Sequence, residues 1–210
     1  MTEAAMWEER YQRPGYWAGA EPAPILREVL PLLPPRSRAL ELAMGEGRNA
    51  VWLAQQGWRV TGVEQAAAGL DKAEALALER GVATSRAAHL AALSAPREAG
   101  LLLVQAEVEG LALPRGVFDL VIVVKFLLRP LLPRIAASLG PGAFLLYETY
   151  TTEQLRFEGG PRNREYLLEP GELREAFRSL DVLFYRETNA GTGMATLLAK
   201  SVKALMVQAT

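Results

Sequence analysis

Short apolar runs alternate with helix-forming runs along most of this chain, and this alternation restricts the fold more than any other feature of the sequence. The apolar runs, many of them β-branched, predict strands at Arg38–Ala43, Trp58–Val63, Leu101–Gln105, Val117–Val124, Ala143–Glu148, Val182–Thr188 and Met194–Ala199. Apolar residues at helical spacing predict helices at Ile25–Leu33, Asn49–Gln56, Ala66–Arg80, Pro130–Ser138 and Pro170–Ser179. Such alternation is typical of α/β proteins with a mainly parallel sheet.

The connection between the last two expected strands is too short for a parallel crossover. Only Asn189–Gly193 separates them, and a loop of this length joins antiparallel neighbours. We therefore expect a Rossmann-like α/β fold whose seven-stranded, mostly parallel sheet ends in a C-terminal antiparallel hairpin and carries helices on both faces.

Two segments do not fit this simple alternation. Val82–Gly100 is longer than a helix-to-strand connection requires, and its Ala, Leu and Arg residues predict an additional helix. Tyr150–Leu168 contains a Gly-rich turn and is expected to form a long functional loop or lid. We expect an aromatic N-terminal arm or lid at residues 1–24, a single domain at 25–200 and a tail at 201–210.

Composition excludes several kinds of chemistry. The 210 residues include no cysteine and only one histidine, His89, so disulfides, thiol nucleophiles and a multi-histidine metal site are not expected. The net charge of −1 gives no indication of a nucleic-acid partner. The polar, acidic N-terminus does not resemble a signal peptide, and no apolar run is long enough to cross a membrane, so we expect a cytoplasmic protein.

A glycine-rich turn joins the first expected strand to the helix that follows it. Gly45 and Gly47 allow the backbone to turn sharply and approach a ligand closely, and the helix start supplies free N–H groups. Glu64 ends the next strand, where a carboxylate can accept both hydrogen bonds of a ribose diol. The pattern predicts an adenosine-containing ligand.

The same turn fits the G-x-G-x-x-A pattern of dinucleotide-binding proteins, so the kind of cofactor needs further evidence. Glu41, at the end of the first strand, is awkward beside a pyrophosphate but suits the ammonium of a methionine moiety. Glu107, after the third strand, can accept from an adenine amino group. With the terminal hairpin, these carboxylates favour S-adenosylmethionine over NAD.

The chain resembles the class I S-adenosylmethionine-dependent methyltransferases, and within them the TehB-like group named for tellurite resistance. The matching stretches are Glu41–Ala54, Trp58–Glu64, Val104–Glu107, Phe118–Val121, Tyr147–Tyr150, Gly160–Asn163 and Pro170–Leu173. The resemblance covers about Trp7 to Lys200 and is specific for the cofactor, whose product would be S-adenosylhomocysteine, but not for the methyl acceptor.

The resemblance also implies roles for individual residues. The methionine end would be lined by Glu41, Ala43, Gly45, Gly47 and Asn49, the ribose held by Glu64 and Gln65, and the adenine placed beside Glu107 and Val108. Lys125 and Phe126 would lie near the sulfonium. Ala43 replaces the first glycine of the usual motif, and Met44, where a smaller residue is usual, is expected to narrow the pocket.

The acceptor side is less defined. Trp7, Tyr11 and Trp17 of the arm, with Phe126 and Arg162, are candidates for the substrate pocket, and Glu148 and Tyr150 for a general base. Because no histidine lies nearby, we expect a small acceptor that needs little proton removal, methylated by in-line displacement, and a monomer or homodimer.

Three other functions stay open from the sequence alone. They are a tRNA methyltransferase using a basic patch, a non-catalytic S-adenosylmethionine-binding module and an NAD(P)-dependent oxidoreductase.

Overall fold

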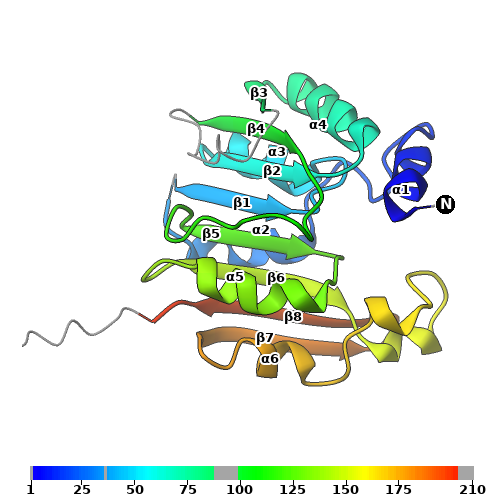
Figure 1. Ribbon diagram of the computed structural model, residues 1–210, viewed down its shortest axis with the longest axis vertical. Coiled ribbons are helices and arrows are strands. Elements are labelled where there is room, and N and C mark those ends of the chain that lie inside the picture. The colour runs from blue at the N-terminus through cyan, green and yellow to red at the C-terminus, as the bar shows by residue number, and fades with distance from the viewer. Residues whose placement is uncertain (1, 36, 88–98, 203–210) are drawn as a thin grey trace, which may run out of the picture.

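A single mixed sheet forms the centre of the molecule, which we describe from a computed structural model over residues 2–35, 37–87 and 99–202 (Figure 1). Its strands are β1 (Arg38–Leu42), β2 (Arg59–Glu64), β3 (Thr84–Ala87), β4 (Gly100–Gln105), β5 (Leu120–Val124), β6 (Phe144–Tyr150), β7 (Asp181–Asn189) and β8 (Gly193–Lys200). They lie in the order β3-β4-β2-β1-β5-β6-β8-β7. The first six are parallel, and β8 is antiparallel to both β6 and β7, which confirms the predicted terminal hairpin.

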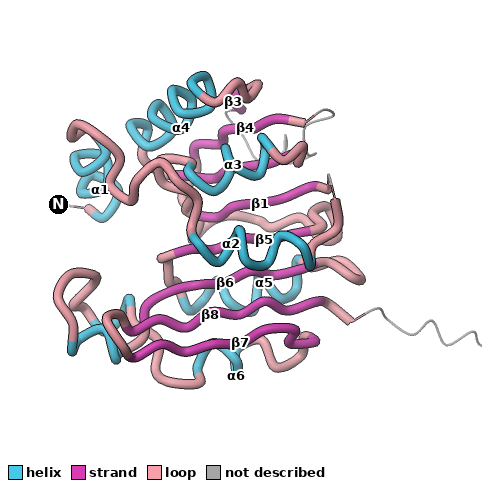
Figure 2. The backbone as a smooth tube through the Cα atoms, turned by 180° about the vertical axis from the view of Figure 1, so that it is seen from behind, coloured by secondary structure: helices cyan, strands magenta, loops and turns pink. Residues whose placement is uncertain are grey.

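Helices cover both faces of the sheet, as predicted. They are α1 (Glu3–Tyr11), α2 (Pro24–Val29), α3 (Arg48–Gln55), α4 (Ala67–Glu79), α5 (Leu132–Ser138) and α6 (Glu172–Ala176). Figure 1 shows α5 and α6 in front of the sheet, and Figure 2, from behind, shows α2 and α3 on the opposite face. Short 3-10 helices occur at Leu30–Leu32, Arg129–Leu131, Thr152–Arg156 and Arg164–Tyr166.

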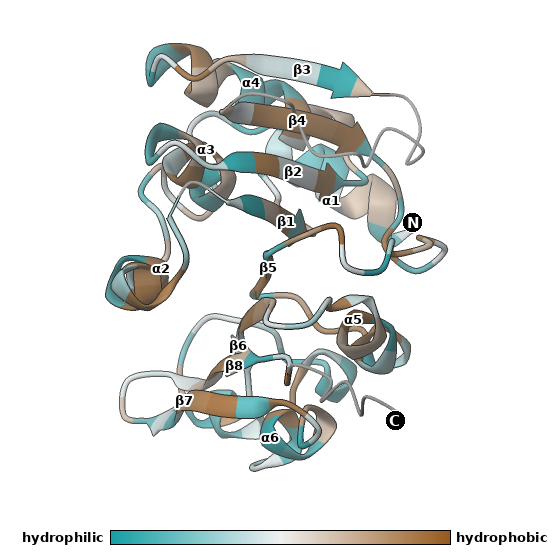
Figure 3. Cartoon of the chain, turned by 90° about the vertical axis from the view of Figure 1, so that its left-hand side faces the viewer, coloured by the Kyte–Doolittle hydropathy of each residue, from teal (hydrophilic) through white to brown (hydrophobic). Residues whose placement is uncertain are grey.

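The central strands are apolar throughout because each contributes to two cores. In β5, Val121 and Val123 pack in the core beneath α5 and α6, whereas Leu120 and Ile122 pack in the core beneath α2, α3 and α4. The strands β4 and β5 are accordingly brown, the hydrophobic end of the scale, in Figure 3. A strand buried on both faces gives a continuous apolar run in sequence, which is why these strands were predictable.

The sheet has eight strands rather than the predicted seven. The additional strand, β3, lies within the segment where we expected only another helix, and it pairs in parallel with β4 at the sheet edge. Its side chains are exposed or half-buried, so the sequence carries none of the apolar signal of an inner strand. The rest of that expected helix, residues 88–98, lies outside the described residues.

Two predicted helices are shorter than expected. The helix beginning near Ile25 ends at Val29 and continues as a 3-10 turn, because Pro31 has no N–H to extend the α-helical ladder. The helix expected from Pro170 is reduced to α6, which begins after the left-handed Gly171.

The arrangement leaves the carboxyl ends of the parallel strands between two covering segments. The arm, residues 2–24, contains α1, which packs against α4. The loop after β6 lies at the same edge of the sheet (Figures 1 and 2). Within the described part of the chain, no helix has the length and apolar character needed to cross a bilayer.

Candidate functional site

A cavity of about 760 Å³ lies at the carboxyl ends of β1, β2, β4, β5 and β6. Its lining includes most of the cofactor residues predicted from sequence, namely Glu41, Ala43, Gly45, Asn49, Glu64, Gln65, Glu107, Val108 and Lys125. It also includes Tyr150 and all the predicted substrate residues, namely Trp7, Tyr11, Trp17, Phe126 and Arg162. The lining formed by the described residues does not include Gly47 or Glu148.

Glu41 presents an unpaired oxygen inside the protein. The residue is 2% exposed, and its Oε1 accepts from Asn49 Nδ2 at 2.8 Å. Its Oε2 is buried without a hydrogen-bond partner among the described residues. Burial raises the pKa of Glu41 to about 7, against the opposing effect of the Asn49 hydrogen bond. An unpaired buried carboxylate oxygen beside a cavity suits a cationic group of a ligand, such as an α-ammonium.

Asn49 acts on the cavity through Glu41. Its Oδ1 accepts from the Ala23 N–H at 2.8 Å while its Nδ2 holds Glu41. The carboxamide therefore links the chain entering α2 to the end of β1, and it leaves Oε2 of Glu41 without a bond to Asn49. Asn49 is a positioning residue in this arrangement.

Glu64 organises the glycine-rich turn. Its Oε2 accepts from the Gly45 N–H and its Oε1 from the Ala66 N–H, each at 2.9 Å. Burial raises the pKa of Glu64, and the backbone hydrogen bonds oppose that rise. Each carboxylate oxygen has a second lone pair, so the same group can still accept from a hydroxyl of a ligand.

The two glycines of the turn have different surroundings. Gly45 has φ +60°, and a Cβ there would lie 2.9 Å from the Tyr11 hydroxyl, so this side chain of the arm lies directly against the turn. Gly47 has φ +78°, and a Cβ would lie 2.6 Å from the Cβ of Ala73 on α4. Gly47 therefore permits close packing of α3 on α4.

Met44 lines the cavity, and its sulfur is directed toward the neighbouring strand. The residue is 5% exposed, and its sulfur packs on Gly62 in the neighbouring strand β2, where a Cβ would collide with it. A glycine on the adjacent strand accommodates the large side chain, and pairing between β1 and β2 brings the two together. Sequence reasoning missed this compensation because it depends on the strand register.

Ala43 and Lys125 follow neighbouring strands, and both have left-handed backbones. Their φ angles are +51° and +58°, which non-glycine residues rarely adopt. Such conformations persist where the surrounding structure determines them, and they gather at functional sites. Both residues line the cavity at the point where β1 and β5 end.

The residues expected beside the adenine, Glu107 and Val108, follow the end of β4. Val108 is buried in the core, Glu107 is exposed, and both line the cavity. Gln105 Nε2 donates to the Gln65 carbonyl at 3.2 Å, which joins the ends of β4 and β2.

The two predicted general bases differ in position. Tyr150 lines the cavity, whereas Glu148 is directed toward β8, where its Oε2 accepts from Thr196 Oγ1 at 2.9 Å. Burial raises the pKa of both groups. Burial also lowers the pKa of Lys125, assisted by the neighbouring Arg48 and opposed by Glu148. Of the two candidates, only Tyr150 is placed to contact a ligand in the cavity.

Aromatic residues of the arm form one wall of the cavity. Trp7 stacks on Tyr11 with ring centroids 5.3 Å apart. The Arg10 guanidinium lies between two indoles, 4.4 Å from the Trp7 centroid and 4.5 Å from the Trp17 centroid. The arm thus presents both apolar and cationic groups to the cavity.

The loop after β6 forms the facing wall. Arg162 donates to the carbonyls of Leu155 (3.0 Å) and Phe157 (2.7 Å), so its guanidinium shapes the loop. Tyr166 lies near the arm: burial raises its pKa, and the nearby Glu3 carboxylate adds to that effect. The two walls therefore face the same cavity although they are far apart in sequence.

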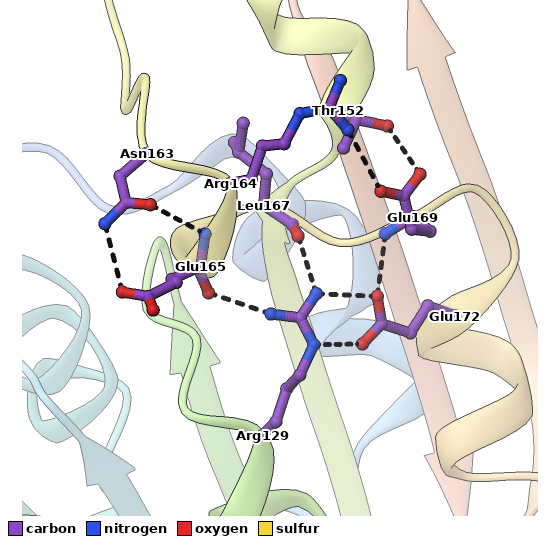
Figure 4. Close-up of polar contacts among 8 residues, drawn as sticks. All are labelled: Arg129, Thr152, Asn163, Arg164, Glu165, Leu167, Glu169 and Glu172. Atoms are coloured by element: carbon purple, nitrogen blue, oxygen red, sulfur yellow. Dashed lines mark hydrogen bonds and ion pairs between the residues drawn. The ribbon is translucent and has the colours of Figure 1, made fainter.

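Arg129 anchors the base of this loop (Figure 4). Its Nε and Nη2 bind both oxygens of Glu172, at 2.6 and 2.9 Å. Its Nη1 and Nη2 also donate to the carbonyls of Glu165 and Leu167. The sequence did not indicate Arg129 as a functional residue, because its partners lie 36 to 43 residues later in the chain.

Three further charged residues were missed: Glu46, Arg48 and Lys72. Glu46 and Lys72 form an ion pair at 2.7 Å, and Arg48 donates to the Ala18 carbonyl at 2.9 Å. The sequence did carry one signal for them: Glu46 is a charged residue between the two glycines of the turn, a position that suggests a specific hydrogen-bonding or ionic partner.

Comparison with known proteins agrees with this geometry. Residues 40–129 match a family model described as a methyltransferase domain. This stretch contains the glycine-rich turn and the ends of β1, β2, β4 and β5. No curated protein sequence matches the chain.

Several solved structures share the fold at low sequence identity. TehB from Haemophilus influenzae aligns with a TM-score of 0.65 and 14% identity, covering 94% of this chain and 66% of that one, so the chain spans just under two thirds of that relative. A TehB-like SAM-dependent methyltransferase from Corynebacterium glutamicum aligns with a TM-score of 0.63 and 17% identity, covering 94% of this chain and 98% of that one. A SAM-dependent methyltransferase from Aquifex aeolicus aligns with a TM-score of 0.61 and 14% identity, covering 96% of this chain and 100% of that one. The chain therefore contains a stretch that matches a methyltransferase domain, and its fold is that of S-adenosylmethionine-dependent methyltransferases of known structure.

Proposed function

We propose that the cavity at the carboxyl edge of the sheet binds S-adenosylmethionine and a small acceptor together, and that the acceptor is methylated there by in-line displacement. The observation that carries the proposal is the buried, unpaired Oε2 of Glu41 at the cavity wall. Left alone, such an oxygen destabilises the fold, so a cationic ligand group is the expected partner.

The residues present fit the cofactor along its length. Glu41, held by Asn49, would take the methionine ammonium, and the turn from Ala43 to Gly45 would lie beside it. Glu64 and Gln65 would hold the ribose, and Glu107 and Val108 would flank the adenine. The cofactor supplies a methyl group already activated on a sulfonium, so the protein has mainly to orient the acceptor and exclude water.

The acceptor side of the cavity is formed by Lys125, Phe126 and Tyr150, with the arm and the loop above them. A volume of about 760 Å³ suits a cofactor with a small molecule. Trp17 and Tyr166 line this cavity from the arm and the loop, and a cavity of this size favours a small acceptor over tRNA. We retain a cytoplasmic location, with the protein as a monomer or homodimer, as part of this proposal.

The chemistry of the acceptor is proposed from the groups nearby. With Glu148 held by Thr196, Tyr150 and the partly desolvated Lys125 are the groups able to take a proton. An acceptor that is already anionic or soft needs neither. Tellurite belongs among the acceptors to test because a structural neighbour is a TehB protein.

A turnover assay tests the proposal. Purified protein is incubated with S-adenosylmethionine and, separately, tellurite, small thiols, small carboxylates, small amines and tRNA, and S-adenosylhomocysteine formation is measured. We expect formation with at least one small acceptor and its loss in Glu41→Gln. Methylation of tRNA alone, or no turnover with any acceptor although the cofactor binds, would contradict the proposal.

A further inference from the structure

Glu46 projects from the glycine-rich turn toward the arm. Its side chain is 4% exposed, and both oxygens have close partners. Oε2 accepts from the Trp17 backbone N–H at 2.6 Å, and Oε1 lies 2.7 Å from Lys72 Nζ. One carboxylate therefore joins three segments: the turn, the arm and α4.

Lys72 completes the link. Its ammonium donates to Glu46 and to the carbonyls of Arg13 (2.7 Å) and Gly15. These three acceptors match the three protons of an ammonium group. The Lys72 side chain is 21% exposed, so water screens this pair less than a surface ion pair.

In this part of the arm, Tyr16 is partly buried against the core beneath α2, α3 and α4, and its neighbours are not. Residues 12–15 and 17–19 are exposed, and the Trp17 side chain is 57% exposed. Besides the packing of Tyr16, this segment is held to the rest of the protein by polar contacts to Glu46, Lys72 and Arg48. Removing a charged partner from such a set leaves buried polar groups unsatisfied.

The same contacts determine the aromatic wall of the cavity. Trp17 is held through its backbone by Glu46, and its ring covers Arg10, which lies on Trp7. Displacement of residues 12–19 would therefore open the cavity beside Gly45. The clamp, which we define as Glu46 and Lys72, joins the turn predicted to face the cofactor to the segment that covers it.

We propose that Glu46 and Lys72 are positioning residues that clamp the N-terminal arm over the cavity and thereby slow release of the nucleoside product. The inference rests on the proposed placement of the cofactor at the glycine-rich turn. It makes opening of this clamp a requirement for exchange of S-adenosylhomocysteine.

Two measurements test the clamp in the full chain. Hydrogen exchange at residues 12–19 without ligand reports the clamp itself, and stopped-flow dissociation of S-adenosylhomocysteine, followed by tryptophan fluorescence, reports its effect on the site. The variants are Glu46→Gln and Lys72→Met, with Lys72→Arg as the conservative rescue. Asp71→Asn is the matched control, because Asp71 precedes Lys72 on α4 and forms an exposed ion pair with Arg86.

We expect both clamp variants to speed dissociation about tenfold and to raise exchange at residues 12–19, because a hydrogen bond to a charged group contributes roughly that factor or more. Lys72→Arg should bring the dissociation rate and the arm exchange close to the wild-type values, and Asp71→Asn should leave both quantities unchanged. If Glu46→Gln unfolds the protein, Lys72→Met still tests the clamp, because Glu46 keeps its hydrogen bond to the Trp17 N–H in that variant. Dissociation and arm exchange equal to those of Asp71→Asn would overturn the inference. If the wild type fails to bind S-adenosylhomocysteine, the cofactor placement fails, whereas arm exchange still reports whether the clamp exists.

Discussion

The carboxyl group of Glu41 is enclosed at the end of β1, with one oxygen on Asn49 and the other without a partner among the described residues. Its pKa is raised by burial from 4.5 to about 7. Between these two values the folded protein holds a proton that the unfolded chain has lost. The contribution of Glu41 to stability is therefore present below pH 4.5 and is lost as the pH rises through about 7.

This protonation predicts a pH-dependent affinity for S-adenosylhomocysteine. A bound ammonium requires ionised Glu41, so binding below pH 7 must release a proton. We expect the affinity to rise by up to about tenfold per pH unit as the pH approaches 7, and then to level off. Calorimetric titration of S-adenosylhomocysteine between pH 5.5 and 8, a range in which the protein must stay folded, would measure this change in affinity.

Glu41→Gln is the control for this pH dependence, because it keeps the shape of the side chain and its bond to Asn49 but cannot ionise. The variant should bind more weakly near neutral pH and with a flatter profile. Glu64 also has a raised pKa, so only the difference between wild type and Glu41→Gln reports on Glu41. Parallel profiles for the two proteins would assign the effect to another group.

At the scale of elements, the packing of α3 on α4 depends on Gly47. A methyl group there would lie 2.6 Å from the Cβ of Ala73 on a backbone with φ +78°. We expect Gly47→Ala to lower the free energy of unfolding by about 2–4 kcal/mol, combining backbone strain with overpacking. Chemical denaturation would measure the loss.

Gly191→Ala is the matched control for this substitution. Gly191 has nearly the same φ, +76°, but open space where its Cβ would be. It should therefore show backbone strain alone, about 1 kcal/mol. Equal losses at the two glycines would mean that the contact between α3 and α4 adds nothing.

The loop that covers the cavity should loosen when Arg129 is removed. Arg129 binds Glu172 with two hydrogen bonds and the loop backbone with two more. In Arg129→Met, we expect faster hydrogen exchange over residues 163–169 with little change in the sheet. Arg178→Met removes an exposed pair with Glu175 and is the control. Unchanged exchange in this part of the loop would show that other contacts anchor it.

Elements and residues that depend on local pattern were predictable from sequence. The inner strand β5 is a continuous apolar run, and the carboxylates Glu41 and Glu64 could be selected because strand ends meet at one edge of a parallel sheet. The edge strand β3 was missed because its half-exposed side chains follow no apolar pattern. The pair of Glu46 and Lys72 was missed because it exists only when α4, the turn and the arm meet in space.

Across the whole molecule, the order of the strands arranges the charges of the cavity. Glu107 follows β4, and Glu64 and Glu41 lie at the ends of β2 and β1. These three strands are adjacent in the sheet, and Lys125 follows β5, the next strand. The arm and the loop after β6 line the same cavity through Glu3 and Tyr166. The fold thus places an acidic half of the cavity beside a half lined by Lys125, Phe126 and Tyr150, with both halves covered.

Calorimetric titration of S-adenosylhomocysteine and of NAD into the wild type and Glu64→Ala tests the central claim, that this cavity is a site for S-adenosylmethionine. We predict binding of S-adenosylhomocysteine in the micromolar range and no binding of NAD. We also predict that binding is lost in Glu64→Ala, because this change removes the proposed ribose contact and the support of the Gly45 turn. Binding of NAD alone, or affinity for S-adenosylhomocysteine that survives in Glu64→Ala, would contradict the assignment of the cavity.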